Sequence, residues 1–440
     1  MAKVIKLRKG LDINLKGKAA AEIAAVKCPG EYALCPDDFH GVKPKVVVKE
    51  GDAVKVGDAL FVDKLHPEVK FVSPVSGTVS LVERGDRRKL LSIRVKSDAK
   101  QEARIFDTMD VKAALLESGL FGFFRQRPYD VVANPDDKPK AIYVSAFNSM
   151  PLSQDFEVAL KGNEAEFQAG ISALAKLAPV RLGVSSRQTS QTLLEAKDCT
   201  VTVFKGKAPA GNVGVQINHT DPINKGEVVW TLGAEEVIFV GRLMTTGKVD
   251  LTRVIALAGS EVKAPKYYKV LVGQQLTTLL EGNASLDGSR IINGNVMTGI
   301  KTTKDAYLAA HATEINVIPE GDHADEMLGW IMPRFGTFST HRSYFSWLCG
   351  KKEYTIDARV KGGERHMIMS GEYDKVFPMD IYAGYLVKAI IAGDIDRQEA
   401  LGIYEVAPED FAIAEFVDSS KLELQRIVRQ GLDILRKENA

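Results

Sequence analysis

The chain has few cysteines, no long apolar run and no excess of charge of one sign. Its four cysteines are spread over 440 residues without a CxxC pair, so zinc and iron–sulfur sites lack ligands and buried, inert thiols are favoured. No stretch offers the ~20 apolar residues of a membrane-spanning helix, and no signal-peptide pattern opens the chain. A net charge of +1 gives no reason to expect nucleic acid. We therefore expect a cytoplasmic protein, soluble or peripheral to a membrane partner.

The length predicts three or four domains, and the first, residues 1–100, contains a repeated β pattern. Between residues 46 and 82, Gly-Asp and Ser-Gly turns separate short apolar runs, which predicts a small β sandwich or barrel. The segments EGDAVKVGDALFVDK and SPVSGTV resemble the barrel-sandwich hybrid of biotinyl and lipoyl carriers. Those carriers modify a hairpin lysine; the nearest one here, Lys64, lacks the methionine flanks and is expected to be an ordinary solvated side chain.

In residues 101–253, apolar strands alternate with helices. Asp110 is a predicted N-cap of a helix that ends at Gly119, and Asn163 with Glu166 predicts a capping box at a second helix. Runs suited to buried strands lie at 141–146, 180–184 and 201–204. This alternation predicts a Rossmann-like α/β domain with a parallel sheet.

Two further domains follow, which makes the whole chain an α/β multidomain protein, α+β overall. Residues 254–325 open with VIALAGSEVKAPKYYKVLVGQQLTTLL, which resembles the soluble-ligand-binding β-grasp module. Residues 326–440 are predicted to be helical, like a ferredoxin-like tail. One helix is expected to open at Asp380 and end at Gly393, and the inward positions predicted for the tail are Ile381, Tyr385, Ala389 and Ile390, then Leu424, Ile427, Gly431 and Ile434.

This order of modules resembles the flavin- and iron–sulfur-carrying NADH-oxidising subunits of respiratory complexes, including the C subunit of the Rnf complex. The strings IKLRKGLDI, VKFVSPVSGTV, LLESGLFGFFRQRP, VIALAGSEVKAP and YDKVFPMD resemble the family of A subunits of the sodium-translocating NADH:quinone oxidoreductase over nearly the whole chain. That resemblance implies a peripheral subunit on the cytoplasmic face of the bacterial inner membrane. It also implies five partner subunits, including membrane-spanning flavoproteins, which hold the catalytic centres, reduce ubiquinone with NADH and pump sodium.

Two departures from the flavin-bearing relatives predict that this chain holds neither flavin nor an iron–sulfur cluster. The relatives place a glycine-rich phosphate cradle after the helix that ends near Ser118, where this chain has the bulky segment 119–129. The relatives also carry the cluster motif CxxCxxCxxxCP in the tail. The matching positions here hold no thiolate; they are Met367, Ser370, Tyr373 and Phe377, followed by Pro378.

Ubiquinone is the one redox ligand that the remaining side chains suit. A quinone needs a flat apolar slot and donors to its two carbonyl oxygens. The candidate quinone-contacting residues are Phe121, Phe123 and Phe124 as the slot, Arg125 and Arg127 as donors, and Pro128 and Tyr129 as the edge, with Phe39 and His40 as a second candidate pair. The alternatives are a packed connection with solvated arginines and, for the second pair, an ordinary surface loop.

The segment 334–354 combines many aromatic rings with arginine, histidine and lysine, a composition that protein interfaces favour. The residues predicted to dock on a partner are Phe335, Phe338, Tyr344, Phe345 and Trp347. Core packing of the helical tail is the alternative. No pair of histidines has a metal-binding spacing such as HExxH, so a metal site is not expected.

Three functions stay open at this point. The first is a peripheral subunit that contributes to ubiquinone reduction and to assembly, without a redox cofactor or catalytic residue of its own. The second is a flavin-dependent NADH dehydrogenase subunit of the Rnf kind. The third is an assembly scaffold without a ligand.

Overall fold

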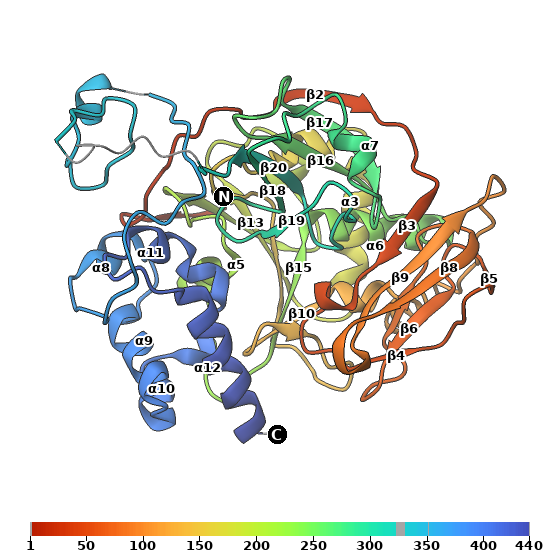
Figure 1. Ribbon diagram of the computed structural model, residues 1–440. Coiled ribbons are helices and arrows are strands. Elements are labelled where there is room, and N and C mark those ends of the chain that lie inside the picture. Colours follow the sequence, from red (N-terminus) through yellow and green to blue (C-terminus); the bar gives the residue numbers. More distant parts are fainter. Residues whose placement is uncertain (1, 323–330, 351, 440) are drawn as a thin grey trace.

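The structure is a computed structural model, and it describes residues 2–322, 331–350 and 352–439. Four units build it: a β barrel, an α/β sheet, a β-grasp sheet and a set of C-terminal helices. Figure 1 shows the barrel and the C-terminal helices at opposite sides of the molecule, with the two sheets between them. The predicted α/β multidomain fold is confirmed.

The barrel consists of two small antiparallel sheets. Their strands are β3 (Glu31–Leu34), β9 (Leu90–Ser97), β8 (Gly77–Arg84) and β5 (Ala53–Val54) in one, and β4 (Pro44–Val46), β6 (Ala59–Asp63) and β7 (Lys70–Val72) in the other. Gly51 and Gly57 both turn the chain with a φ of +89°, and the aspartate after each accepts a backbone N–H. The repeated Gly-Asp pattern therefore forms the barrel's turns, as the sequence predicts.

The N-terminal segment contributes strands to the two other sheets. β1 (Lys3–Lys6) pairs with β14 (Thr200–Lys205) of the α/β sheet, and β2 (Ala20–Ala25) pairs with β17 (Lys266–Leu271) of the β-grasp sheet. Strands β1 and β2, which fall within the first predicted domain, thus pair with both neighbouring sheets before the barrel begins, and this pairing ties three units together.

The α/β sheet has the strand order β1-β14-β13-β12-β15-β10-β11, with the first five strands parallel. Besides β1 and β14, its strands are β12 (Ile142–Ser145), β13 (Val180–Ser185), β15 (Val229–Gly233) and the antiparallel β10 (Arg125–Arg127) and β11 (Val131–Val132). Its helices are α1 (Val111–Glu117), α2 (Phe156–Leu160), α3 (Glu164–Leu174), α4 (Gln191–Leu194), α5 (Val213–Thr220) and α6 (Ala234–Thr246). The predicted parallel sheet is confirmed.

Of the two predicted helix caps, one is present. Asp110 accepts hydrogen bonds from the backbone N–H groups of Lys112 and Ala113 and caps α1. The capping box at α3 is wrong, because the Asn163 side chain makes no cap and its amide donates instead to the carbonyl of Ala159 in α2. α2 ends at Leu160, three residues before Asn163, so a carbonyl in its last turn accepts the Asn163 amide that the isolated motif assigns to α3.

Helices α3 and α6 pack closely because each presents a glycine to the other. A Cβ atom on Gly241 would overlap the backbone carbonyl of Glu166, and one on Gly170 would overlap that of Val237. The backbones can approach only where both side chains are absent.

The β-grasp sheet has the order β19-β18-β20-β16-β17-β2. Its elements are β16 (Thr252–Ala258), β17, α7 (Thr277–Leu280), β18 (Ser289–Asn293), β19 (Ile300–Thr302) and β20 (Glu314–Pro319). Leu276, Leu279 and Leu280 are buried in its core, as the sequence predicts for one helix face.

The C-terminal unit is helical. Its elements are α8 (Glu372–Val376), α9 (Ala383–Ala392), α10 (Ile395–Ala400), α11 (Ala412–Val417), α12 (Leu424–Glu438) and the short 3-10 turns η5 (Ile403–Glu405) and η6 (Pro408–Phe411). Gly393 ends α9 in the left-handed conformation as predicted, but the helix begins at Ala383 and not at Asp380. Within the described residues, no helix is long and apolar enough to cross a membrane.

Two of the predicted inward positions in these helices are wrong. Tyr385 is 60% exposed and Ile434 is 50% exposed. The buried face of α12 instead passes through Val428, Leu432 and Leu435. The predicted and the observed buried faces of α12 both include Gly431, where the side chain of Ile390 packs closely. This contact turns the helix so that the predicted face no longer points inward.

A buried ion cluster joins the α/β sheet to the β-grasp sheet. Arg253 of β16 lies 3.3 Å from Glu235 and 2.7 Å from Glu236, both in the first turn of α6. Burial raises the pKa of Glu235 to about 7. At Glu236 burial also acts to raise the pKa, but Arg253 and His311 together outweigh it and lower the pKa of that carboxyl to about 2. The amide of Gln154 donates to Glu235, and its backbone N–H donates to the buried Glu314.

The raised pKa of Glu235 predicts how stability changes with pH. Between about pH 4.5, the ordinary value, and pH 7 the folded chain binds more protons here than the unfolded chain. Stability therefore falls as the pH rises through that window. Replacing Glu235 by Gln should remove roughly 1–3 kcal/mol of this change, measured by urea unfolding across the window.

Glu195→Gln is the matched control, because Glu195 is exposed and should leave the pH dependence unchanged. Equal slopes for Glu235→Gln and the unmodified chain would contradict the account of this cluster.

Candidate functional site

The aromatic loop that we predicted as a quinone slot connects α1 to β10 through the short turn η3 (Leu120–Phe123). The rings of Phe121 and Phe124 stack at 5.3 Å, and both meet the indole of Trp230 edge-on, at 5.3 and 5.8 Å. Both phenylalanines are fully buried. The structure thus places these two rings in the core, which matches the packed alternative, and leaves neither open to a ligand.

Arg127 is also enclosed, but in an ion cluster. Its guanidinium is 1% exposed and lies 3.7 Å from Asp130, 2.9 Å from Glu409 and 3.4 Å from Asp410. Burial alone would lower the pKa of Arg127, but the three carboxylates raise it above its ordinary value. The residue is therefore a permanent cation that binds the C-terminal helices. Its two terminal nitrogens donate to Asp410 and Glu409, while its Nε is buried without a hydrogen-bond partner among the described residues.

The end of the loop lies against α12. The peptide bond from Arg127 to Pro128 is cis, and Tyr129 and Asp130 both have positive φ angles, of 81° and 51°. The guanidinium of Arg429 donates to the carbonyls of Tyr129 and Asp130. Pro128 and Tyr129, the predicted slot edge, thus form a turn that α12 holds in place.

The two candidate quinone sites come together in space, although they are far apart in the sequence. The ring of Phe39 lies 5.7 Å from that of Phe123, and both lie against His311, at 5.6 and 5.4 Å. Beside them, Arg125 is 39% exposed and lies 3.8 Å from Asp130. We call the set Phe39, His40, Phe123, Arg125 and His311 the aromatic–basic wall.

His40 is the most exposed member of this wall. Its side chain is 46% exposed, and its Nε2 atom lies 3.1 Å from Asp433 of α12. Its backbone carbonyl accepts the N–H of Val132 in β11, which fixes residue 40 beside the α/β sheet. The wall therefore offers two partly exposed donors, Arg125 and His40, above rings that are almost completely buried.

His311 is the member that sequence reasoning missed. Burial, together with the nearby Arg125, lowers the pKa of His311, and Glu236 lies 3.8 Å from its Nδ1 atom. Asp38, which accepts the N–H of Ala310, has its pKa raised by burial to about 6. His311 reaches the wall only because the β-grasp unit docks on the barrel, so no local motif reports it.

A polar cleft of about 640 Å³ lies where β12, β13 and β14 end. Ligands of open α/β sheets commonly bind at the carboxyl ends of the strands, and this cleft has that position. Its lining includes Asn148, Ser149, Gln154, Lys18, Arg187 and Lys352. Acidic side chains of Asp12, Asp155, Glu157 and Glu353 also line it, so neither sign of charge dominates.

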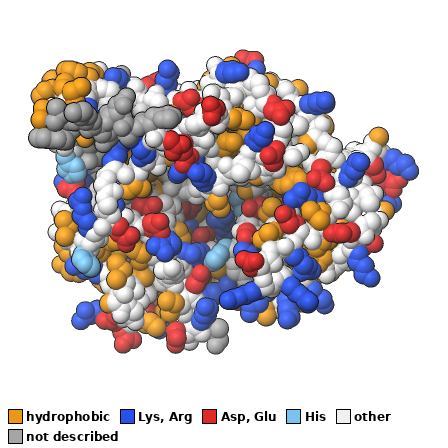
Figure 2. All heavy atoms as spheres, viewed as in Figure 1, with side chains coloured by type: hydrophobic (Ala, Val, Ile, Leu, Met, Phe, Trp, Pro, Cys, Tyr) orange, Lys and Arg blue, Asp and Glu red, His pale blue; other side chains and the backbone are white. Residues whose placement is uncertain are grey.

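The predicted docking segment projects from the C-terminal unit. Phe335, Phe345 and Trp347 are 48%, 52% and 47% exposed, and Trp347 contacts the guanidinium of Arg342. Figure 2 shows hydrophobic side chains gathered at the upper left, where Figure 1 places residues 331–350. Tyr344 is partly exposed, and only Phe338 packs inward on other rings, those of Tyr354 and Phe416.

Of the four tail positions that match the relatives' cluster ligands, Tyr373 and Phe377 are buried and pack in the helical core, whereas Met367 is partly buried and Ser370 is exposed. Tyr373 is buried and donates to Asp418 at 2.9 Å, and Phe377 packs on Phe411. Of the four cysteines, Cys28 and Cys349 are exposed, so the prediction of four buried thiols is wrong. Cys28 lies in the link between two sheets and Cys349 in η4 (Phe345–Cys349), both outside the cores.

Comparison with known proteins covers most of the chain. Three family models match: the NqrA N-terminal barrel-sandwich hybrid domain over residues 5–98, the NqrA second alpha/beta domain over 106–249, and the NqrA C-terminal domain over 254–304. Two solved structures of the NAD+-reducing [NiFe]-hydrogenase, H2-reduced and air-oxidised, match at 14% identity with TM-scores of 0.35 and 0.37. They cover 48% and 74% of this chain, and 47% and 66% of their own.

Full-length relatives are much closer. Proteins of Haemophilus influenzae strain PittGG and Saccharophagus degradans are 35% identical to this chain, and one of Actinobacillus pleuropneumoniae serotype 5b is 34% identical. Each alignment covers 99% of this chain and 100% of the relative, and each relative is named as the A subunit of the Na(+)-translocating NADH-quinone reductase. The chain therefore belongs to the NqrA family, the A subunits of the sodium-translocating NADH–quinone reductase.

Proposed function

We propose that this chain contributes to ubiquinone reduction as a peripheral subunit of the complex and holds no redox cofactor of its own. The observation that supports quinone contact is the convergence of Phe39, Phe123, His40, Arg125 and His311 into one wall. A quinone would lie beside the exposed parts of Arg125, His40 and His311, over the buried rings of Phe39 and Phe123. Its carbonyl oxygens would accept hydrogen bonds from the exposed donors.

Charge supports this use of the wall. Reduction places negative charge on the ring oxygens, and a guanidinium or an imidazolium stabilises such charge more than a neutral donor does. Arg125 is suited to this role because it keeps an exposed side, whereas Arg127 on the same strand is enclosed by three carboxylates. Phe121 and Phe124 pack on each other and on Trp230 in the core, away from the ligand.

Two substitutions support the proposal that redox cofactors lie in other subunits. The segment that matches the phosphate cradle of flavin-bearing relatives contains Phe121 and Phe124, whose buried rings fill the space. The positions that match thiolate ligands hold Tyr373 and Phe377, which pack in the helical core. The resemblance supplies the rest of the proposal: five partner subunits, some of them membrane-spanning flavoproteins, and a place on the cytoplasmic face of the inner membrane.

We further propose that the segment around Phe335, Tyr344, Phe345 and Trp347 docks on a membrane-spanning subunit of the complex. Large rings at nearly half exposure, flanked by arginine, are typical of interface centres. Leu348 and Ile331 extend the same apolar surface at 61% and 62% exposure. Phe338 anchors the segment to the helical unit through Phe416.

Docking can be tested by affinity capture from detergent-solubilised native membranes. The double variant Phe345→Ser and Trp347→Ser should lose the co-purifying membrane-spanning subunits, because its interface loses two large rings. The control pair Ile105→Ala and Met109→Ala, exposed at 76% and 89% before α1, should retain them. Full recovery of the partners with the first pair would contradict docking through this segment.

Quinone contact can be tested with a labelled quinone analogue and the purified chain. Arg125→Ala and His40→Ala should each weaken binding about 10-fold or more, because each removes a hydrogen bond from a charged or chargeable donor. Arg397→Ala, whose side chain is 79% exposed and paired within α10, is the matched control. Unchanged affinity in both wall variants would rule out the wall as the quinone site.

A further inference from the structure

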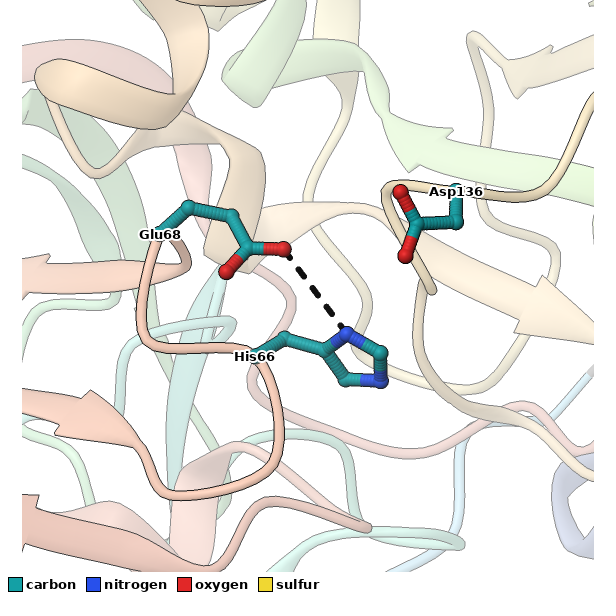
Figure 3. Close-up of side chains that lie close together, drawn as sticks. All are labelled: His66, Glu68 and Asp136. Atoms are coloured by element: carbon teal, nitrogen blue, oxygen red, sulfur yellow. Dashed lines mark ion pairs between the residues drawn. The ribbon is translucent and has the colours of Figure 1, made fainter.

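Three potential metal ligands meet on the surface between the barrel and the α/β sheet (Figure 3). His66 and Glu68 lie in the loop between β6 and β7, and Asp136 lies in the loop after β11. One ligand atom from each residue lies within 4.8 Å of the other two. His66 Nδ1 is 3.8 Å from a carboxylate oxygen of Glu68, and Figure 3 shows the carboxylates of Glu68 and Asp136 both on the side of the imidazole that carries Nδ1.

The barrel loop that carries His66 and Glu68 is held by Asp63. One carboxylate oxygen of Asp63 accepts the backbone N–H of Lys43 at 3.1 Å and that of Leu65 at 3.2 Å. The carbonyl of His66 accepts the N–H of Val69 at 2.9 Å, which closes the turn. These bonds fix the backbone and leave both potential ligand side chains free to turn toward a common point.

The facing loop is also held by hydrogen bonds, and they involve the neighbouring aspartate. Asp137 accepts from the side chains of Gln126 and Asn134, at 2.8 and 3.2 Å. The backbone N–H of Asp136 donates to Asn134 at 3.1 Å. The Asp136 carboxylate itself has no hydrogen-bond or ion-pair partner among the described residues, so a fixed loop presents a free carboxylate toward His66.

The charge of the group favours a cation. Two carboxylates approach one imidazole, and no lysine or arginine pairs with Glu68 or Asp136 in the described part of the chain. An imidazole nitrogen with two carboxylate oxygens is a donor set for divalent transition metals such as Zn²⁺ and Co²⁺. Bonds of about 2.0–2.2 Å to one ion require the ligand atoms to draw together slightly. The exposure of His66 and Glu68, at 31% and 44%, leaves their side chains room to do so.

We propose that His66, Glu68 and Asp136 form a divalent transition-metal site that ties the barrel loop to the α/β unit. Three protein ligands leave a coordination position for water or for a further ligand from a partner. The site is separate from the aromatic–basic wall, and the proposal does not depend on quinone binding.

The test is a Co²⁺ titration of the purified full-length chain, followed by visible absorption, with Zn²⁺ as competitor. A nitrogen–oxygen site shows weak d–d bands alone, whereas Co²⁺ on the exposed Cys28 or Cys349 adds strong sulfur-to-metal charge transfer in the near ultraviolet. His66→Ala, Glu68→Gln and Asp136→Asn should each weaken Co²⁺ binding at the nitrogen–oxygen site about 10-fold or more, because each removes one of the three ligands. His366→Ala, an exposed histidine elsewhere, is the control and should bind as the unmodified chain does.

A second readout tests the link between the two units. Zn²⁺ should raise the Tm of the unmodified chain and of His366→Ala, but not that of Asp136→Asn, while all three have the same Tm without metal. Co²⁺ affinity in the three site variants equal to that of the unmodified chain, or binding that shows only thiolate bands, would overturn the proposal.

Discussion

The buried guanidinium of Arg127 is the interaction on which the placement of the C-terminal helices depends. It comes from the edge of the α/β sheet and meets Glu409 and Asp410 of η6, while Asp130 completes the cluster from its own loop. Removing one partner of such a buried group leaves an uncompensated charge and costs about 3–5 kcal/mol. The cluster is satisfied only when the helices are docked, so it selects one arrangement of the two units.

The same docking places α12 beside the aromatic–basic wall. α12 supplies Arg429, which holds the turn after β10, and Asp433, which pairs with His40. Arg125 and Arg127 lie two residues apart and share Asp130, yet only Arg125 keeps an exposed side. Positive charge near the wall is therefore divided between one arginine that supports structure and one that is available to a ligand. The barrel contributes Phe39 and the β-grasp unit contributes His311, so all four units meet around this point.

The sequence predicts the parts of this molecule that local chemistry decides. The Gly-Asp turns of the barrel, the Asp110 cap and the alternation of strands and helices depend on residues close together in the chain. Contacts between distant segments decide the rest. Trp230 determines that Phe121 and Phe124 are enclosed, Ile390 at Gly431 turns α12 away from Ile434, and domain docking brings in His311. The apposition of Asp136 and His66 depends in the same way on two loops that are unrelated in sequence.

Amide hydrogen exchange of an Arg127→Met variant tests the central claim most directly, with Arg397→Met at an exposed surface pair as its control. If Arg127 joins the units, its loss should raise exchange together in residues 125–132 and in η6 and α12, because these segments open as one unit. Exchange in the barrel strands should stay unchanged. Unaltered protection of η6 and α12 in Arg127→Met would contradict the account, since the helices would then be held to the sheet by other contacts.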